Sequence, residues 1–154
     1  MKLSMTVVLF LAVTVTPSNQ ENMPGAPLLQ DPDGESATAK ACLATRKLNS
    51  DHSDDNFHAL AKVKNFTTQV VNGVYYNLDF YVVETSCIAG EVAGKLVGEE
   101  KCATKTPIVM KLCSASIFSK PWDNINNQVQ EVKCRKIHQR QHPENWSRVT
   151  CKAK

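Results

Sequence analysis

The dipeptide Asn72-Gly73 constrains the fold more than any other feature, because it separates two long runs rich in β-branched and aromatic residues. Both residues tolerate the positive φ that a tight type I′ turn requires. In the runs that start at Phe57 and at Val74, apolar and polar residues largely alternate, as in half-buried strands. We therefore predict one long antiparallel hairpin. Its tip is unusually apolar, which indicates contact with a partner; the residues concerned are Val70, Val71 and Val74.

The segments on either side of this hairpin predict one helix and further strands. The composition favours a helix from Ser36 to about Asn49, with an apolar face formed by Ala37, Ala41, Ala44 and Leu48. Two more strands are predicted over residues 108–118 and 126–134, and residues 88–101 form an irregular, Gly-containing insert. One helix followed by antiparallel strands predicts an α+β domain in which the helix covers one face of the sheet.

The N-terminal residues 1–18 have the pattern of a secretory signal peptide. Lys2 precedes an apolar run too short to span a bilayer as a helix, and cleavage is expected near Ser18. Residues 19–34 contain several Pro and Gly without periodicity, which predicts an extended, mobile leader. No later stretch predicts a membrane span. A length of 154 residues with 42% apolar content suits one domain. A secreted, extracellular protein is therefore expected.

Charge and cysteine content narrow the classes of partner and site. The net charge is +3, and no basic block is interleaved with aromatics, which argues against nucleic acid as a partner. Six cysteines predict disulfides in an exported chain, although six allow about 15 pairings: Cys42, Cys87, Cys102, Cys113, Cys134 and Cys151. The alternative, a zinc site, lacks a Cys-x-x-Cys pair. Sequons at Asn65 and Asn145 predict glycosylation.

A tryptophan in a predicted turn, Pro121-Trp122, has two interpretations. Its ring could fold back and cap the core, or it could stay exposed as an interface anchor, since Trp is over-represented among interface hot spots. Turns after alternate antiparallel strands emerge at the same end of a sheet. The turns at Asn72-Gly73 and Pro121-Trp122 can therefore lie side by side.

Three motifs in this order resemble the cystatins, inhibitors of papain-like cysteine proteases. The segment Gln69-Val70-Val71-Asn72-Gly73 matches their Gln-x-Val-x-Gly signature, Pro121-Trp122 matches their second-loop Pro-Trp, and Gly25 stands where secreted members keep an N-terminal glycine. The resemblance covers about residues 23–134. It implies a cystatin-like fold, in which a five-stranded antiparallel sheet wraps around one long helix, and a cystatin domain over residues 35–134.

The resemblance also implies a binding site and a mechanism. The leader and two hairpin loops would form a wedge that fills the protease cleft, with Met23 and Pro24 in non-primed subsites and Trp122 on the primed side. Gly25 would let the leader turn away from the catalytic thiolate, while residues 69–73 would lie beside it. No scissile bond is presented, so inhibition would be reversible occlusion. The implied partners are proteases of cathepsin L, B and S type.

Disulfides follow from the same resemblance. It pairs Cys87 with Cys102 and Cys113 with Cys134, which leaves Cys42 and Cys151 to each other. Cys42 is expected at the outer side of the helix, outside the alanine face. Our hypothesis is that the tail crosses back and is stapled there, which closes a loop of order 100 residues.

Two departures from the family pattern bear on specificity. Pro24 stands where a branched aliphatic residue is common. Proline fixes φ and has no N–H, so it loses any substrate-like backbone hydrogen bond at this position. It should favour proteases whose S2 pocket accepts proline. Some secreted cystatins inhibit legumain through an Asn after the helix. Alignment from Gln69 puts Ser53 at that position, with Asn49 and Asn56 out of register, so a legumain site is not expected.

The C-terminal extension, residues 135–154, is basic and lies beyond the residues that the resemblance covers. It is expected to be a solvated extension. The alternative is a cystatin-fold protein that does not inhibit proteases and acts through this tail in host defence or polyanion binding. His138 and His142 could share a helical face, but two histidines without a third ligand do not predict a metal site. His52 and His58 are expected at the surface.

No nucleophile-and-base signature is present, so an enzyme is not predicted, and no cofactor is implied. The protein is expected to be a monomer, although long hairpins with strained loops also allow a domain-swapped dimer.

Overall fold

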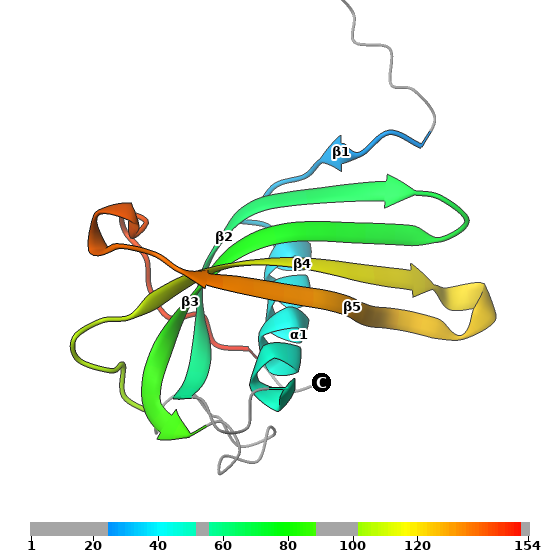
Figure 1. Cartoon of the computed structure of the whole chain (residues 1–154). Helices are drawn as coiled ribbons and strands as arrows, with labels where there is room; N and C mark the ends of the chain where they lie inside the picture. The colour runs from blue at the N-terminus through cyan, green and yellow to red at the C-terminus, as the bar shows by residue number, and fades with distance from the viewer. Residues whose placement is uncertain (1–24, 52–55, 89–101, 152–154) are drawn as a thin grey trace, which may run out of the picture.

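One α-helix packs against a five-stranded antiparallel sheet in the computed structural model, which describes residues 25–51, 56–88 and 102–151 (Figure 1). The strands follow one another in the sheet in the order of the chain. They are β1 (Leu28–Leu29), β2 (Asn56–Val70), β3 (Val74–Ile88), β4 (Met110–Lys120) and β5 (Ile125–Lys136), and the helix is α1 (Glu35–Asp51). The predicted α+β class, with one helix packed on a five-stranded antiparallel sheet, is confirmed.

The helix packs closely on the sheet because small residues line the face that meets it. Ala37, Ala41 and Ala44 are fully buried, and they lie in one cluster with the large side chains Phe80 and Ile117 of the sheet. Alanine favours the helix and leaves room for close approach of the two backbones. The predicted helix and its alanine face are confirmed, and its bounds at Glu35 and Asp51 agree with a predicted start at Ser36 or Glu35 and an end at residues 49–51.

Asn49 ties the end of the helix to the start of β2. Its side-chain Nδ2 donates to the His58 carbonyl at 2.9 Å, and the His58 backbone N–H donates to Asn49 Oδ1 at 2.8 Å. This reciprocal pair draws both residues inward, and His58 is only 1% exposed. The expectation that His58 lies at the surface is therefore wrong; His52 lies outside the described residues.

The short strand β1 was not predicted. Leu28 and Leu29 pair with Thr68 and Thr67 of β2, and the Gln30 N–H donates to the Phe66 carbonyl at 2.8 Å. The segment lacks strand periodicity, but the free edge of β2 offers backbone partners that hold it in place. This part of the predicted leader is thus an ordered edge strand.

A second apolar cluster lies on the sheet face opposite the helix, and the C-terminal extension covers it. Ala59, Ala61, Val83 and Met110 form this cluster, whereas their chain neighbours Leu60 and Val82 point toward the helix. Neighbouring residues of a strand point to opposite faces, which accounts for the division. Ile137 and Trp146 of the extension pack against this second cluster.

The extension then crosses the edge of β2 and reaches the helix. The Val149 N–H donates to the Leu60 carbonyl at 2.8 Å, and Cys151 forms a disulfide with Cys42 of α1. Cys42, which we expect at the outer side of the helix, is only 6% exposed. It belongs to the same buried cluster as the alanines, and Val149 and Cys151 of the extension pack against that cluster. The expectation of a solvated extension is wrong for four residues that pack on the two clusters, Ile137, Trp146, Val149 and Cys151. Most residues between them, including residues 138–141, are exposed as expected.

All six cysteines are paired. The bonds are Cys42–Cys151, Cys87–Cys102 and Cys113–Cys134. Cys113 and Cys134 lie opposite each other in the β4–β5 register. Most of the insert that the Cys87–Cys102 bond closes lies outside the described residues. Within the described part of the chain, no helix has the length and apolar character needed to cross a membrane.

Candidate functional site

The loop between β2 and β3 contains three residues, Val71, Asn72 and Gly73, because Val70 still pairs with Val74. The predicted two-residue type I′ turn is therefore wrong in its length. Both residues of the Asn72-Gly73 pair adopt positive φ as expected, 45° and 139°. The Val71 N–H donates to the Gly73 carbonyl at 3.0 Å and closes the loop. We call residues 71–73 the first loop.

Gly73 is required by space as well as by conformation. A Cβ at this position would lie 2.5 Å from Phe118 Cε2 and 3.0 Å from the Ser119 carbonyl oxygen, closer than real Cβ atoms approach. The Phe118 ring in turn packs on Tyr75, with 4.6 Å between ring centroids. The aromatic pair from β3 and β4 thus supports the first loop from below. The sequence offers no signal for this contact, because it depends on the register of β3 against β4.

The two valines before Asn72 project into solvent. Val70 is 64% exposed and Val71 is 50% exposed. Within the described residues, large hydrophobic side chains with this much exposure are few, and these two lie next to each other on a closed loop. Exposed apolar groups on a constrained loop are typical of a contact surface.

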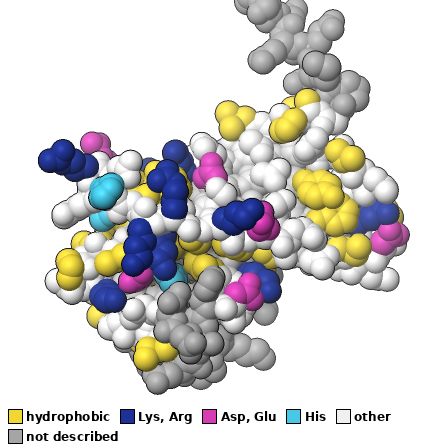
Figure 2. All heavy atoms as spheres, viewed as in Figure 1, with side chains coloured by type: hydrophobic (Ala, Val, Ile, Leu, Met, Phe, Trp, Pro, Cys, Tyr) yellow, Lys and Arg dark blue, Asp and Glu magenta, His cyan; other side chains and the backbone are white. Residues whose placement is uncertain are grey.

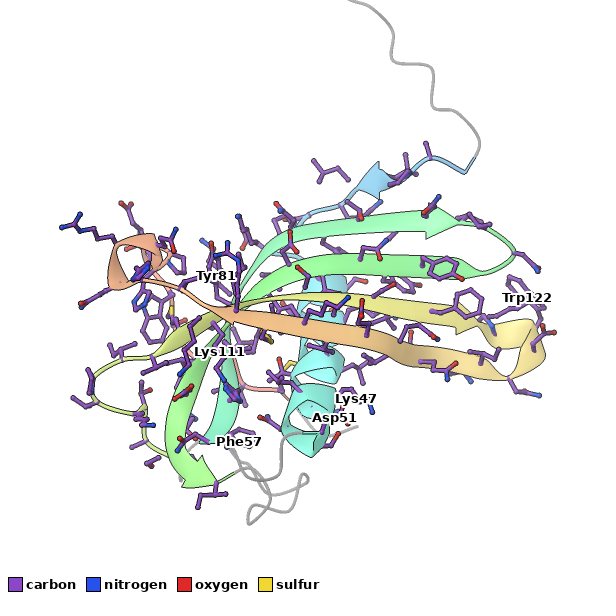
Figure 3. The ribbon with its side chains drawn as sticks, in the orientation of Figure 1. Lys47, Asp51, Phe57, Tyr81, Lys111 and Trp122 are labelled. Carbon is purple, nitrogen blue, oxygen red and sulfur yellow. A yellow bond between two sulfur atoms is a disulfide. The ribbon has the colours of Figure 1, made fainter. Side chains whose placement is uncertain are left out.

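The second loop, residues 121–124, is a short 3₁₀ turn between β4 and β5. Pro121 starts the turn with its fixed φ, and Asn124 ends it at a φ of 59°, with its N–H donating to the Pro121 carbonyl at 3.1 Å. Trp122 is 64% exposed. Figure 3 shows it at the tip of the β4–β5 hairpin. The interpretation of Trp122 as a core cap is therefore wrong.

The N-terminal segment reaches the same end of the sheet. Gly25 has a φ of 82°, and its carbonyl accepts a hydrogen bond from Gln69 Nε2 at 2.8 Å. A Cβ on Gly25 would meet nothing closer than the Val70 carbonyl oxygen at 3.8 Å, so the glycine is needed for its backbone conformation and not for space. Met23 and Pro24, the other predicted site residues of the leader, lie outside the described residues.

These three segments lie side by side along one edge of the molecule. Gln69 contacts Gly25, Val70 pairs with Val74, Val74 pairs with Ser119, and Lys120 pairs with Ile125 across the second loop. Figure 1 shows both hairpin tips and the start of β1 at the same end, and Figure 2 shows hydrophobic side chains gathered there. We call this set, residues 25–27, 70–73 and 121–124, the wedge.

The wedge and its supporting strand ends carry no net charge. Over residues 25–30, 69–75 and 118–124 the charged residues are Lys120 and Asp123, which form an ion pair at 2.5 Å. The surface that the wedge presents therefore consists of apolar side chains, backbone and a few neutral side-chain amides. Such a surface suits a groove from which it can displace water. Because it carries no net charge, it does not attract a partner electrostatically over long range.

The remaining predicted sites lie elsewhere. Asn65 and Asn145 are both exposed, and Asn65 Nδ2 donates to Asp79 Oδ2 at 3.0 Å. Ser53 lies outside the described residues, and Asn49 is buried by its pairing with His58.

His138 and His142 flank a 3₁₀ turn, η2 (Gln139–Gln141), so they do not share an α-helical face. The described residues contain no group of three or more potential metal ligands.

Comparison with known proteins connects this chain to one family. A family model described as the cystatin domain matches residues 27–122. Cystatin-1 of Chilobrachys guangxiensis is 30% identical over 107 residues, which cover 69% of this chain and 77% of that protein. Kininogen-1 of Rattus norvegicus is 29% identical over 75% of the chain, which spans only 17% of that longer protein. A solved salivary cystatin of the soft tick Ornithodoros moubata has a TM-score of 0.58 and 28% identity, and covers 73% of this chain and 99% of its own.

Proposed function

The chain belongs to the cystatin family, whose members inhibit cysteine proteases and are not enzymes, and we propose that it is a reversible, tight-binding, non-covalent inhibitor of papain-like cysteine proteases. The observation that carries this proposal is the wedge itself. Three segments, far apart in the sequence, meet at one edge and expose Val70, Val71 and Trp122 there. Each segment supplies apolar surface that the walls of a substrate groove would remove from water.

The backbone of the wedge explains why the inhibitor would not be cleaved. Both loops turn sharply through residues with positive φ, Asn72 and Gly73 in the first and Asn124 in the second. A substrate must lie extended across the catalytic thiolate, and neither loop offers an extended peptide bond there. Gly25 turns the leader in the same way. The protease would thus be blocked by occupation of its cleft, with no covalent step.

Rigidity supports tight binding through a surface of ordinary size. The first loop is closed by its own hydrogen bond and held from below by Phe118, and the second is closed by the bond between Asn124 and Pro121. A preformed surface loses little conformational entropy on docking, so an interface near the standard ~1,600 Å² can bind tightly.

The finer assignments extend the same proposal. Met23 and Pro24 would occupy non-primed subsites of cathepsin L, B or S type proteases, and Pro24 would favour those whose S2 pocket accepts proline. We propose a secreted monomer with a signal peptide over residues 1–18, a leader over 19–34, a cystatin domain over 35–134 and an extension over 135–154. The salivary origin of the tick relative supports export.

Titration of active papain with the secreted form tests the proposal. Activity should fall linearly to near zero at one inhibitor per active protease and should return when the complex is diluted or chased. Because the wedge is neutral, the association rate should change less than about twofold between 50 and 500 mM salt. Trypsin, a serine protease, is the control and should keep its activity. Undiminished papain activity at molar excess, or loss that dilution never reverses, would contradict the proposal.

A further inference from the structure

The side chain of Gln69 forms a hydrogen bond within the protein, at a partly exposed place on the surface. Gln69 is the residue before the exposed end of β2, opposite Tyr75, and its Nε2 donates to the carbonyl of Gly25 at 2.8 Å. The two residues are separated by 44 positions in the chain. The hydrogen bond therefore joins the leader to the end of β2 that carries the first loop, and so links two of the three segments of the wedge.

We propose that Gln69 is a positioning residue, which fixes the leader in the wedge before a protease binds. This inference rests on the proposed inhibitory function. It assigns the Gln69 side chain a role within the inhibitor, whereas the leader and the exposed side chains of the two loops make the proposed direct contacts with the protease.

The position of the bond along the leader supports this role. Strand β1 holds Leu28 and Leu29 to β2 by backbone pairing, and that pairing starts only after Pro27. Among the described residues 25–27, the hydrogen bond recorded to the rest of the domain is the one from Gln69 to Gly25. It lies at the point where Gly25 turns the chain with its φ of 82°. Loss of the bond would leave this turn free to rotate about an unrestrained glycine.

The chemistry of the bond requires a hydrogen-bond donor at position 69. A carbonyl oxygen accepts hydrogen bonds and cannot donate one, so the partner must be a donor. Glutamine supplies an N–H and carries no charge, which suits a half-buried place in a neutral wedge. A leader that is already held in its bound direction loses less conformational entropy when the protease binds. The resulting gain in affinity should appear mainly as a slower dissociation of the complex.

Gln69→Met tests the inference, because it keeps the length of the side chain and removes the donor. It should weaken papain inhibition about fivefold, the effect of one partly exposed neutral hydrogen bond. Gln30→Met is the matched control. Gln30 Nε2 donates to Thr68 Oγ1 at 3.1 Å on the same edge but outside the wedge, so its loss should change inhibition less than about twofold.

A double-mutant cycle with the leader separates positioning from direct contact. The same substitutions are made in a form that begins at Ala26, which lacks the Gly25 acceptor. If Gln69 acts by holding the leader, Gln69→Met should have almost no further effect in this shortened form. An equal fivefold loss in both forms would overturn the inference and would show that Gln69 contacts the protease directly. Failure of the unaltered protein to inhibit papain would instead contradict the proposed function.

Gln69→Glu adds a readout that a purely structural role would not change. Near neutral pH its carboxylate faces the Gly25 carbonyl oxygen, so it should inhibit less well than Gln69→Met. In buffer of about pH 4 the introduced carboxyl is largely protonated and can donate, so Gln69→Glu should then match or exceed Gln69→Met. The comparison of two variants at each pH cancels the effect of pH on the protease. A ratio that does not change with pH would contradict the inference.

Discussion

Replacing Cys42 and Cys151 together with alanine is expected to lower the free energy of unfolding by about 4 kcal/mol. The bond closes a chain separation of 109 residues, the longest of the three disulfides. In the chain-entropy model, closing a loop of about 100 residues stabilises the folded state by ~4.7 kcal/mol, and removal of native disulfides typically costs ~2–5 kcal/mol. The packing that the extension makes without the bond remains, so the fold should survive.

Urea-induced unfolding under non-reducing conditions measures this effect. Lys47→Ala is the matched control on the same helix, because Lys47 only forms an exposed ion pair with Asp51 at 2.8 Å. That pair should contribute less than about 0.5 kcal/mol. Inhibition of papain by the double-alanine variant should stay within about twofold, since the wedge lies at another edge. A loss of less than about 1 kcal/mol would show that the extension is held by its packing alone.

Trp122→Ala is expected to weaken protease inhibition by about thirtyfold or more without a change in stability. A buried interface tryptophan commonly contributes ~2 kcal/mol or more to binding, which corresponds to this factor. The ring is 64% exposed in the free protein, so its removal leaves no cavity in the core. The inhibition constant for papain and the unfolding midpoint in urea, measured on the same preparation, test both halves of the prediction.

The second tryptophan of the chain provides the matched control. Trp146 packs against the second apolar cluster, which includes Ala59, Val83 and Met110, and it lies outside the wedge. Trp146→Ala should therefore lower stability by about 2–4 kcal/mol and leave inhibition by the folded fraction unchanged. Equal effects of both substitutions on inhibition would contradict the assignment of Trp122 to the contact surface.

Local patterns predicted the elements that carry strong periodicity. The alanines of α1 and the alternation around Asn72-Gly73 indicated the helix and the main hairpin within a few residues. The strand β1 could not be predicted, because Leu28 and Leu29 stand in a proline-rich segment and pair only because β2 has a free edge there. The three-residue length of the first loop follows from the pairing of Val70 with Val74 between β2 and β3. The contact of Phe118 with Gly73 depends in addition on the β3–β4 register, which no local pattern specifies.

The extension escaped prediction for a related reason. Its apolar residues Ile137, Trp146 and Val149 follow no period, since the first two pack on the outer sheet face and the third crosses an edge to reach the helix side. In the wedge, the sequence motifs indicated which segments matter and that they could share one edge. They could not indicate that Gln69 bonds to Gly25, because this contact joins distant parts of the chain.

Hydrogen exchange of the free protein and of its papain complex tests the central claim most directly. The account predicts that exchange slows in the complex at all three segments of the wedge, residues 25–27, 70–73 and 121–124, while the extension, residues 137–151, exchanges as in the free protein. Inhibition of papain with slowed exchange confined to the extension or to the outer face of the sheet, and none at the two loops, would contradict it.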